Sequence, residues 1–129
     1  MNRADPLIAV IDDEAPVRTM LGRVLRLASY RVNAYASGED FLASLVAELP
    51  ACAVLDLHMP GLSGFQVQAR MRNGNIAVPV VFITASDEVA LDRSVQEAGG
   101  IRLLRKPFSS DELLEAIATA MSRNAGGSP

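Results

Sequence analysis

Five short stretches of the chain carry the residue pattern of β-strands. Three of them, at residues 7–11, 51–55 and 80–83, are continuous apolar runs, which are typical of strands buried on both faces of a parallel sheet. A fourth stretch, residues 101–104, is rich in isoleucine and leucine. A fifth, residues 31–35, alternates as a half-exposed or edge strand does. We therefore expect five strands, one of them half-exposed or at an edge.

Segments with helical periodicity separate these strands. After the first strand, apolar residues recur at i, i+3, i+4, i+7 and i+8, and arginines occupy the opposite face. Shorter apolar faces follow the other strands. The residues predicted to face inward are Val17, Met20, Leu21, Val24, Leu25, Phe41, Leu42, Leu45, Phe65, Met71, Leu113, Leu114, Ile117 and Met121.

Several helices have recognisable ends in the sequence. Ser37 and Ser63 can each cap a helix, and Ser109 can do so with a glutamate at capping-box spacing. A further helix is predicted over residues 87–98, because two acidic residues suit its positive end and Gly99 ends it.

The order of these elements predicts an α/β fold. A strand is followed by a helix five times over, and this alternation implies a doubly wound, five-stranded parallel sheet with helices on both faces. We expect one domain over residues 1–122. Residues 123–129, which are small and glycine-rich, are expected to be a flexible tail or the beginning of a linker.

Composition agrees with a single globular domain and excludes some functions. The chain has 129 residues, of which 50% are hydrophobic and 5% are aromatic, with no tryptophan, so the core must be mainly aliphatic. The formal net charge is −3, from 12 basic and 15 acidic residues. So mild a balance does not mark a protein that binds nucleic acid or a membrane surface.

The location of the protein is also constrained. No apolar stretch approaches the roughly 18 residues of a membrane span, and no signal peptide is visible, so we expect a soluble, cytoplasmic protein. Cys52, the single cysteine, cannot form an internal disulfide and fits a reducing compartment. We expect it to be buried and inert.

Polar residues with the chemistry of a binding site follow four of the predicted strands. They are Asp12, Asp13, Asp56, Thr84 and Lys106. In open α/β sheets, ligands bind beyond the carboxyl ends of the strands. Three carboxylates in one crevice require a cation, for which Mg²⁺ is well suited, and a hydroxyl with an ammonium group would hold an anion such as phosphate.

Each of these residues also has a purely structural explanation. Either of the two adjacent aspartates could cap the helix that begins near Pro16. Asp56 could open a turn, and Thr84 could be a strand-end residue or a helix N-cap. Lys106 could be a solvated surface lysine. Their joint placement at four strand ends favours a common site.

Five motifs, in this order and separated by full β-α units, resemble those of the receiver domain of bacterial two-component response regulators. The resemblance covers residues 7–122 and implies the flavodoxin-like strand order 2-1-3-4-5. The motifs are Ile11-Asp12-Asp13-Glu14, Asp56-Leu57-His58-Met59-Pro60-Gly61 with Gly64, Thr84-Ala85, Ala98-Gly99 and Lys106-Pro107-Phe108.

The resemblance implies a role for each acidic residue. Asp56 would be the phosphoacceptor and would attack the phosphohistidine of a partner sensor histidine kinase. Asp13, Asp56 and the backbone carbonyl of His58 would ligate Mg²⁺, and Asp12 would help mainly through water. The imidazole ring of His58 has no part in the family's pattern.

The resemblance also implies a switch. Lys106 would pair with the phosphoryl oxygens, and the Thr84 hydroxyl would move to bond one of them. Ala85, Leu103 and Pro107 would be supporting residues, with a cis bond before Pro107, a form that is accessible to any X-Pro bond.

Three positions are specific to this chain. Leu103 stands where receivers commonly carry an inward-turning tyrosine or phenylalanine, which puts the usual aromatic relay in doubt. His58 and Ser86 flank the pocket at positions that vary among relatives, and they could tune loss of the phosphoryl group.

The expected function is that of a switch and not of an enzyme with a separate substrate. Phosphorylation would reshape the surface of the fourth helix, fifth strand and fifth helix, and an output domain or partner protein would read it. A homodimer on phosphorylation is a family expectation, whereas direct contact with nucleic acid or membrane is not. The stretch 59–64 resembles that of receivers joined to LuxR-type DNA-binding domains, which slightly favours transcription regulation by a longer protein over a single-domain regulator that acts through protein contacts.

Two other functions are compatible with acidic strand ends. A haloacid dehalogenase-type phosphatase also uses Mg²⁺ and an aspartyl nucleophile, but that nucleophile follows the first strand in an Asp-x-Asp pattern, and here the two aspartates are adjacent. A degenerate, unphosphorylated interaction module is the other alternative, which the complete set of site residues argues against and Leu103 keeps open.

Overall fold

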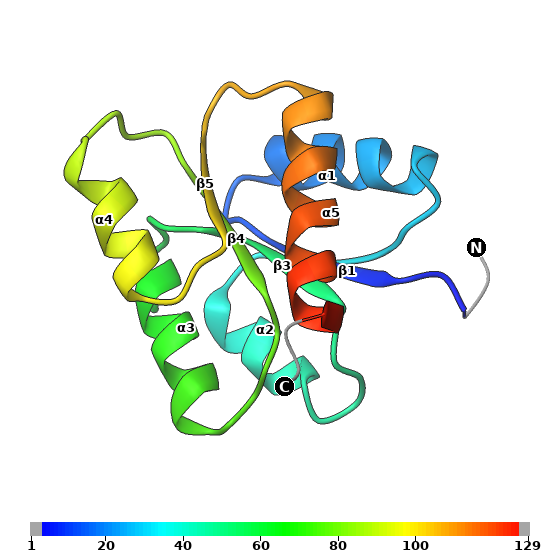
Figure 1. Cartoon of the computed structure of the whole chain (residues 1–129), viewed down its shortest axis with the longest axis horizontal. Helices are drawn as coiled ribbons and strands as arrows, with labels where there is room; N and C mark the ends of the chain where they lie inside the picture. Colours follow the sequence, from blue (N-terminus) through cyan, green and yellow to red (C-terminus); the bar gives the residue numbers. More distant parts are fainter. Residues whose placement is uncertain (1–3, 127–129) are drawn as a thin grey trace.

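Strands and helices alternate along the whole described chain, as the sequence predicts (Figure 1). The computed structural model describes residues 4–126, and the side chains of residues 4–123. The strands are β1 (Leu7–Ile11), β2 (Arg31–Tyr35), β3 (Cys52–Asp56), β4 (Val80–Thr84) and β5 (Arg102–Arg105), and the helices are α1 (Ala15–Leu27), α2 (Gly38–Ser44), α3 (Gly64–Asn73), α4 (Ala90–Glu97) and α5 (Ser110–Gly126).

The strands form one parallel sheet in the order β2-β1-β3-β4-β5. This order confirms the doubly wound α/β fold expected from the sequence. β2, the strand with the alternating pattern, lies at an edge and is only partly buried. β1 and β3 are direct neighbours, so the residues that follow them meet at the same edge of the sheet.

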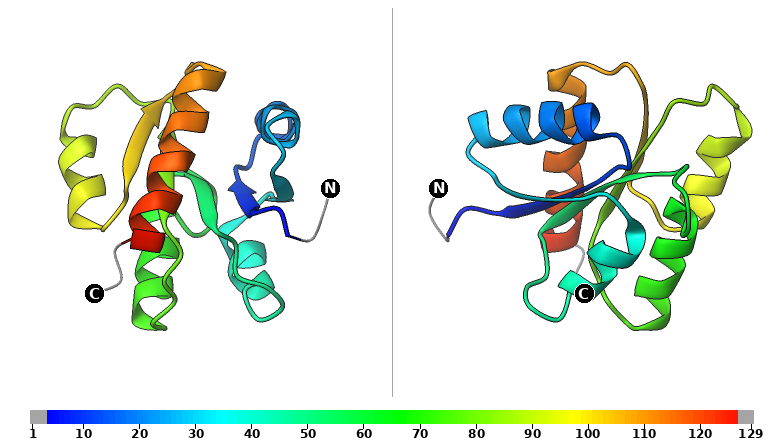
Figure 2. Two further views of the ribbon diagram at one scale, coloured as in Figure 1. Left: turned by 45° about the vertical axis from the view of Figure 1, so that its right-hand side comes forward. Right: turned by 180° about the vertical axis from the view of Figure 1, so that it is seen from behind.

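Helices cover both faces of the sheet, as two further views show (Figure 2). One core cluster joins the sheet to α1 and α5, and the other joins its opposite face to α2, α3 and α4. The described core is mostly aliphatic, as the composition requires, with Phe41 and Phe82 as its largest fully buried side chains.

The inward faces of the helices follow the predicted pattern with two departures. Met20 was expected to face inward, but it is exposed, because α1 packs on the sheet through a narrow stripe centred on Leu21 and Leu25. Gln68 was not expected in the core, yet it is buried with its side-chain amide donating to the backbone carbonyl of Ala98, 3.1 Å away. A polar side chain is tolerated inside when it is hydrogen-bonded.

The predicted serine caps are confirmed. The Ser37 hydroxyl accepts a hydrogen bond from the backbone of residue 40 at the beginning of α2. Ser63 and Ser109 form full capping boxes with Gln66 and Glu112, in which each side chain bonds the other residue's backbone N–H. These bonds satisfy amide groups that the first turn of a helix leaves unpaired.

The predicted beginning of the fourth helix is wrong. Asp87 and Glu88 lie in an exposed connection, and α4 begins only at Ala90. The reason is local, because side-chain hydroxyls in this connection bond backbone N–H groups and hold turns in place of helix. The other end is as expected, since α4 ends at Glu97 and Gly99 has a φ of 84°, which favours glycine.

The C-terminal helix is longer than the sequence suggests. α5 runs to Gly126, past residue 122, and residues 127–129 of the predicted tail lie outside the described residues. The domain limits themselves stay a prediction. Within the described part of the chain, no helix has the length and apolar character needed to cross a membrane.

Candidate functional site: an acidic pocket at the carboxyl edge of the sheet

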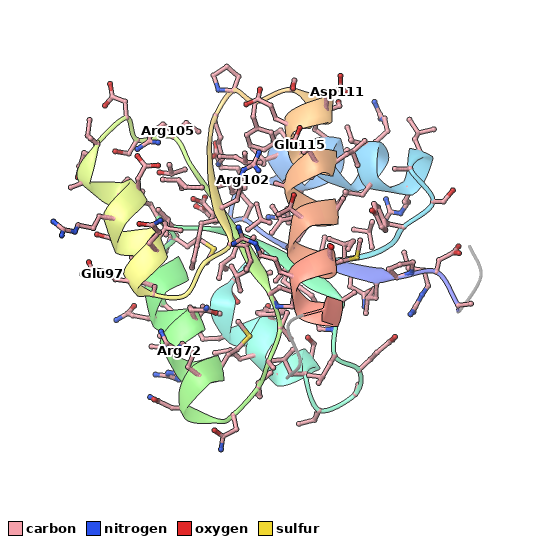
Figure 3. All side chains as sticks on the ribbon, in the orientation of Figure 1. Arg72, Glu97, Arg102, Arg105, Asp111 and Glu115 are labelled. Atoms are coloured by element: carbon pink, nitrogen blue, oxygen red, sulfur yellow. The ribbon has the colours of Figure 1, made fainter. Side chains whose placement is uncertain are left out.

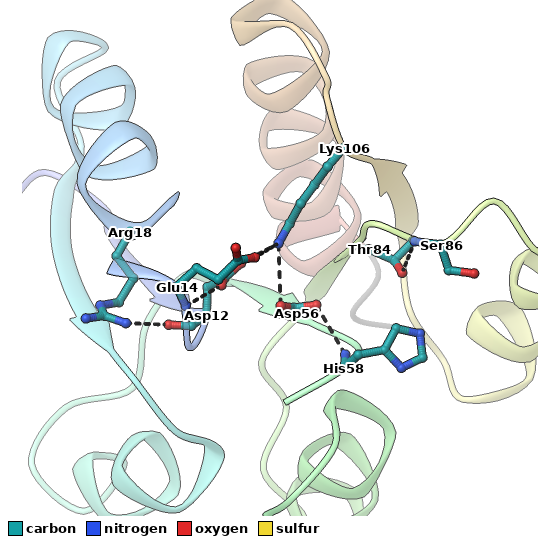
Figure 4. Close-up of polar contacts among 8 residues, drawn as sticks. All are labelled: Asp12, Glu14, Arg18, Asp56, His58, Thr84, Ser86 and Lys106. Atoms are coloured by element: carbon teal, nitrogen blue, oxygen red, sulfur yellow. Dashed lines mark hydrogen bonds and ion pairs between the residues drawn. The ribbon is translucent and has the colours of Figure 1, made fainter. Parts of the chain in front are cut away.

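Polar residues from four strand ends meet at one edge of the sheet (Figure 4). Asp12 follows β1, Asp56 is the last residue of β3, Thr84 is the last residue of β4 and Lys106 follows β5. The parallel strand order alone brings these positions to one edge, although they are up to 94 residues apart in the chain. The four side chains are buried or half-buried.

Three aspartates lie close together in this pocket. Asp12 is completely buried and Asp56 is 4% exposed, whereas Asp13 is exposed. One carboxylate oxygen from each of them lies within 4.8 Å of the other two. Like charges at this range destabilise one another unless a cation joins them, and carboxylate oxygens suit hard divalent cations. The donor set therefore fits a metal ion such as Mg²⁺.

Asp12 is held from several sides. Its Oδ1 accepts a hydrogen bond from the Glu14 backbone N–H at 2.9 Å, and its carbonyl accepts one from Arg18 at 2.7 Å. Its own backbone N–H donates to the carbonyl of Tyr35 on β2, at 3.1 Å. Asp12 is not the N-cap of α1, because that position is Glu14, which makes no side-chain cap.

In the described structure, the ammonium group of Lys106 lies between the carboxylates of Asp12, Glu14 and Asp56. Its Nζ lies 2.9 Å from Asp12 Oδ2, 3.3 Å from Glu14 Oε1 and 3.5 Å from Asp56 Oδ2. Burial by itself would lower the pKa of Lys106, but the contacts with these carboxylates outweigh it and leave the pKa above its usual value. Lys106 is thus a charged, half-buried partner of the acids and not a solvated surface lysine.

Asp56 is easier to protonate than an ordinary aspartate. Burial raises its pKa to about 6, the Asp12 charge adds to this rise, and the His58 backbone N–H and Lys106 oppose it. The His58 N–H lies 3.2 Å from Asp56 Oδ1, so the backbone of His58 and not its ring faces the acid (Figure 4). The structure thus holds a carboxylate whose charge is only partly compensated.

The Thr84 hydroxyl is turned toward the connection that follows β4 (Figure 4). Thr84 is completely buried, and its Oγ1 accepts a hydrogen bond from the Ser86 backbone N–H at 3.0 Å. The Ser86 hydroxyl in turn accepts one from the Glu88 backbone N–H, at 3.2 Å. Thr84 is therefore the first member of a short chain of turns, and it is not the N-cap of a helix.

Of the residues expected to support a switch, Ala85 and Pro107 directly follow Thr84 and Lys106, whereas Leu103 lies within β5. Leu103 is half-buried and packs against the core cluster that contains Phe82. The Lys106–Pro107 peptide bond is cis, as the resemblance implies, and Pro107 and Ala85 are exposed. Cys52 is buried in β3 as expected, and burial raises the pKa of its thiol to about 12.

Two contacts of the pocket were not predicted. Glu14 pairs with Lys106, and Arg18 bonds the Asp12 backbone. A run of three acidic residues facing a single lysine was a usable signal for the first contact. The second contact depends on the direction in which α1 leaves the sheet, and nothing in the residue pattern indicates that direction.

Comparison with known proteins identifies the family. The family model of the response regulator receiver domain matches residues 8–118. Nodulation protein W of Bradyrhizobium diazoefficiens is 31% identical over 118 residues, which are 92% of this chain and 52% of that protein. Transcriptional regulatory protein FixJ of the same species is 32% identical over 114 residues, which are 88% of this chain and 56% of FixJ.

A solved structure agrees with these matches. The crystal structure of FixJ-N superposes with a TM-score of 0.85 at 30% sequence identity, covering 95% of this chain and 96% of that one. The chain spans about half the length of the curated relatives it matches.

Fold and site together define a signalling module with an acidic pocket on a doubly wound sheet. The chain belongs to the response regulator receiver domain family. Such domains act in two-component signalling, where sensor kinases phosphorylate them and they regulate output domains, and they are not enzymes in the ordinary sense. This membership decides against the phosphatase alternative raised by the sequence.

Proposed function

We propose that this receiver accepts a phosphoryl group on Asp56, in a Mg²⁺-dependent reaction with a sensor histidine kinase. The observation that carries this proposal is the setting of Asp56. It is a nearly buried carboxylate with two further aspartate oxygens within 4.8 Å and a lysine ammonium group 3.5 Å away. A nucleophile, a set of metal ligands and a cation for phosphoryl oxygens thus share one pocket.

The chemistry needs no strong base. An ionised Asp56 oxygen forms a bond to the phosphorus of a phosphohistidine, and the P–N bond breaks with its electron pair left on the imidazole, which then takes up a proton. Because Asp56 has a pKa of about 6, it is mostly ionised at neutral pH and ready to attack. The acyl phosphate that forms is reactive, so the phosphorylated state is temporary.

Asp13, Asp56 and the His58 carbonyl would hold Mg²⁺ directly, and Asp12 would assist through water, as the family resemblance implies. When bound, the metal ion neutralises charge on the transferring phosphoryl group. Asp13 is the exposed member of the set, so it faces the side from which an ion and a phosphodonor arrive.

Lys106 and Thr84 are assigned to the phosphoryl oxygens. Lys106 would exchange its contact with Asp56 for one with the phosphoryl group. The Thr84 hydroxyl would leave the Ser86 N–H and donate to a phosphoryl oxygen, so that the β4–α4 connection loses a hydrogen bond on phosphorylation. Such a change favours one conformation over another, which is what a switch requires.

The output is proposed from the relatives. Transcriptional regulatory protein FixJ is named as a regulator of transcription, and this chain matches about half of it. We propose that the receiver controls a transcription-regulating output domain or partner in the cytoplasm, through the surface of α4, β5 and α5, and that it forms a homodimer on phosphorylation. Ala85, Leu103 and Pro107 would support the conformational change.

The test is phosphorylation by a small donor. The protein is incubated with Mg²⁺ and acetyl phosphate, and its intact mass is measured beside Asp56→Asn and Asp13→Asn variants. We expect one phosphoryl adduct on the wild type, none on Asp56→Asn, and a strongly reduced amount on Asp13→Asn or with a chelator. A folded wild-type protein that forms no adduct would leave only the unphosphorylated interaction module.

A further inference from the structure

The first turn of α4 is held differently from the beginnings of the neighbouring helices. The backbone of its N-cap residue, Val89, has helical geometry, and no side chain caps the helix. The connection before it is exposed, and Val89 itself is 84% exposed. No side-chain cap therefore fixes the connection and the first turn, and within this turn only Leu91 is buried.

The side chain of Arg105, the last residue of β5, makes hydrogen bonds to this segment. The guanidinium group of Arg105 bonds both carboxylate oxygens of Asp92 in the first turn of α4, at 3.2 and 3.0 Å. Its Nη2 also donates to the backbone carbonyl of Glu88, at 2.6 Å. Arg105 thus ties the strand that leads to Lys106 to both the connection and the helix that follow Thr84 (Figure 3).

These contacts complete a chain that begins in the pocket. The Ser86 N–H bonds the Thr84 hydroxyl, the Glu88 N–H bonds the Ser86 hydroxyl, and the Glu88 carbonyl accepts from Arg105. The first link involves the hydroxyl that the proposed function moves. The last link is made by a side chain on the surface, where it can be changed without touching the pocket.

The contact between Arg105 and Asp92 is weak enough to break at a small cost in free energy. The side chains of Arg105 and Asp92 are 32% and 59% exposed, so the ion pair is screened by water. Within the part of the chain whose side chains are described, Arg105 Nε is the one buried side-chain nitrogen or oxygen with no hydrogen-bond partner. A buried N–H that lacks a partner favours any conformation in which the arginine turns out into solvent.

The other end of α4 is fastened more firmly. The Ala98 carbonyl, at the C-terminal end of the helix, accepts hydrogen bonds from Gln68 at 3.1 Å and from Arg72 at 3.0 Å, both on α3. Gln68 is buried, and Val95, in the second half of the helix, is 3% exposed, whereas Leu91 in the first turn is 9% exposed. A loss of the Arg105 contacts would therefore free the N-terminal end of α4 first.

We propose that Arg105 is a positioning residue, a latch that holds the β4–α4 connection and the first turn of α4 in the unphosphorylated arrangement. Release of this latch accompanies the movement of Thr84 and lets α4 turn about its Ala98 end. The energetic link to phosphorylation rests on the function proposed above, whereas the latch in the unphosphorylated protein does not.

The latch is tested first without phosphorylation, by amide hydrogen exchange of residues 85–92. Arg105→Gln and Asp92→Asn should each speed exchange in this segment about two- to fivefold, the factor expected for an exposed ion pair. The double variant should behave like Arg105→Gln, because the contact with Asp92 is already lost in that single variant. Arg105→Lys keeps the positive charge but loses the paired hydrogen bonds of the guanidinium group, so it should retain part of the protection that Arg105→Gln loses.

Arg102→Gln is the matched control. Arg102 lies on the same strand and makes a similar exposed ion pair of 3.0 Å, but with Glu115 on α5. This variant should leave exchange in residues 85–92 unchanged. Equal exchange in wild type, Arg105→Gln and Asp92→Asn, or an equal effect of Arg102→Gln, would overturn the latch.

The link to the pocket is tested with beryllofluoride and Mg²⁺, a non-covalent analogue of the phosphoryl group, because linkage between two equilibria is reciprocal. Arg105→Gln should bind this probe about two- to fivefold more tightly than wild type, while Arg102→Gln should not. Unchanged affinity beside faster exchange would leave a structural ion pair and refute the coupling. No binding by the wild type would instead count against the proposed function, and the exchange result would stand.

Discussion

Two connections leave the pocket from neighbouring strands, and they differ in how firmly they are held. The one after β3 ends in the Ser63–Gln66 capping box, and the Gly64 N–H donates to the Leu57 carbonyl at 3.0 Å. The one after β4 reaches α4 without a side-chain cap and is exposed along most of its length. Asp56 thus lies on the firmly held side and Thr84 borders the loosely held one.

The difference separates chemistry from response. A nucleophile and its metal ligands must stay within a narrow geometry, which capping and close packing around Asp56 provide. A response requires a segment with two accessible arrangements, which are drawn from the less stable parts of a fold. Substitutions on the firm side should therefore affect stability strongly, and substitutions on the loose side weakly.

The largest effect on stability is expected for Lys106→Met. It leaves the buried carboxylates of Asp12 and Asp56 without the ammonium group that contacts both. We expect a loss of about 3 kcal/mol in the free energy of unfolding at pH 8 without metal, because breaking a buried ion pair leaves uncompensated charge. Urea unfolding measures it.

The control for this variant is Lys106→Arg, which keeps the positive charge and should lose much less. The loss for Lys106→Met should also shrink at pH 5, where Asp56 takes up a proton. A loss of equal size at both pH values would show that packing and not charge is responsible.

The next effect is a dependence of stability on pH that belongs to Asp56. Its pKa is raised from 3.8 to about 6, so the folded state binds the proton more tightly than the unfolded state. The stabilisation from this proton is complete below about pH 4 and is lost as the pH rises through 6. Metal-free wild type should therefore become less stable relative to Asp56→Asn, by on the order of 2 kcal/mol between pH 4 and pH 7.5.

Denaturant unfolding of both proteins across this range, in the presence of a chelator, measures the difference. Taking the difference cancels the titration of other groups. A constant difference would mean that Asp56 titrates as an ordinary aspartate and that burial does not raise its pKa.

Gly64→Ala should disturb the firm connection. A Cβ at this position would lie 2.6 Å from the Asp56 carbonyl oxygen and 3.0 Å from the Leu57 Cα, which are backbone atoms that cannot turn aside. We expect a loss of about 2 kcal/mol, as for other overpacked sites, together with less phosphoryl adduct on the displaced Asp56. Gly74→Ala, where the nearest atom lies 3.4 Å away, is the matched control and should change neither stability nor adduct.

The smallest effect is expected on the loose side. Thr84→Ala removes the acceptor of the Ser86 N–H and should cost about 1 kcal/mol, while hydrogen exchange in the connection after β4 increases. Asp56 should still accept a phosphoryl group. Thr84→Ser keeps the hydroxyl and should behave like wild type, and a loss as large as that of Lys106→Met would contradict the proposed division of the pocket.

The sequence predicts the residues around Asp56 and the connection after β3 better than it predicts the connection after β4. Asp12, Asp56 and Lys106 could be placed from their strand ends, because a parallel sheet brings such positions together whatever the details of packing. The capping serines could be placed because their bonds are local. The first inference depends on a general property of parallel sheets and the second on local hydrogen bonds, and both hold in most folds.

The loose side depends on contacts between distant parts of the chain. Asp87 and Glu88 look like the beginning of a helix, but the Thr84 and Ser86 hydroxyls hold turns there, and Arg105 binds from another strand. No local pattern distinguishes these arrangements, since each is a reasonable use of the same residues. Gln68 was missed for a similar reason, because its burial depends on the end of another helix.

Reductive trapping can identify the residue that carries the phosphoryl group. The protein is phosphorylated with acetyl phosphate and Mg²⁺ and treated with borohydride, which reduces an aspartyl phosphate to homoserine, and its peptides are sequenced by mass spectrometry. We expect homoserine at position 56 and at no other aspartate of the pocket. Homoserine at position 12 or 13 with Asp56 unmodified would contradict this expectation.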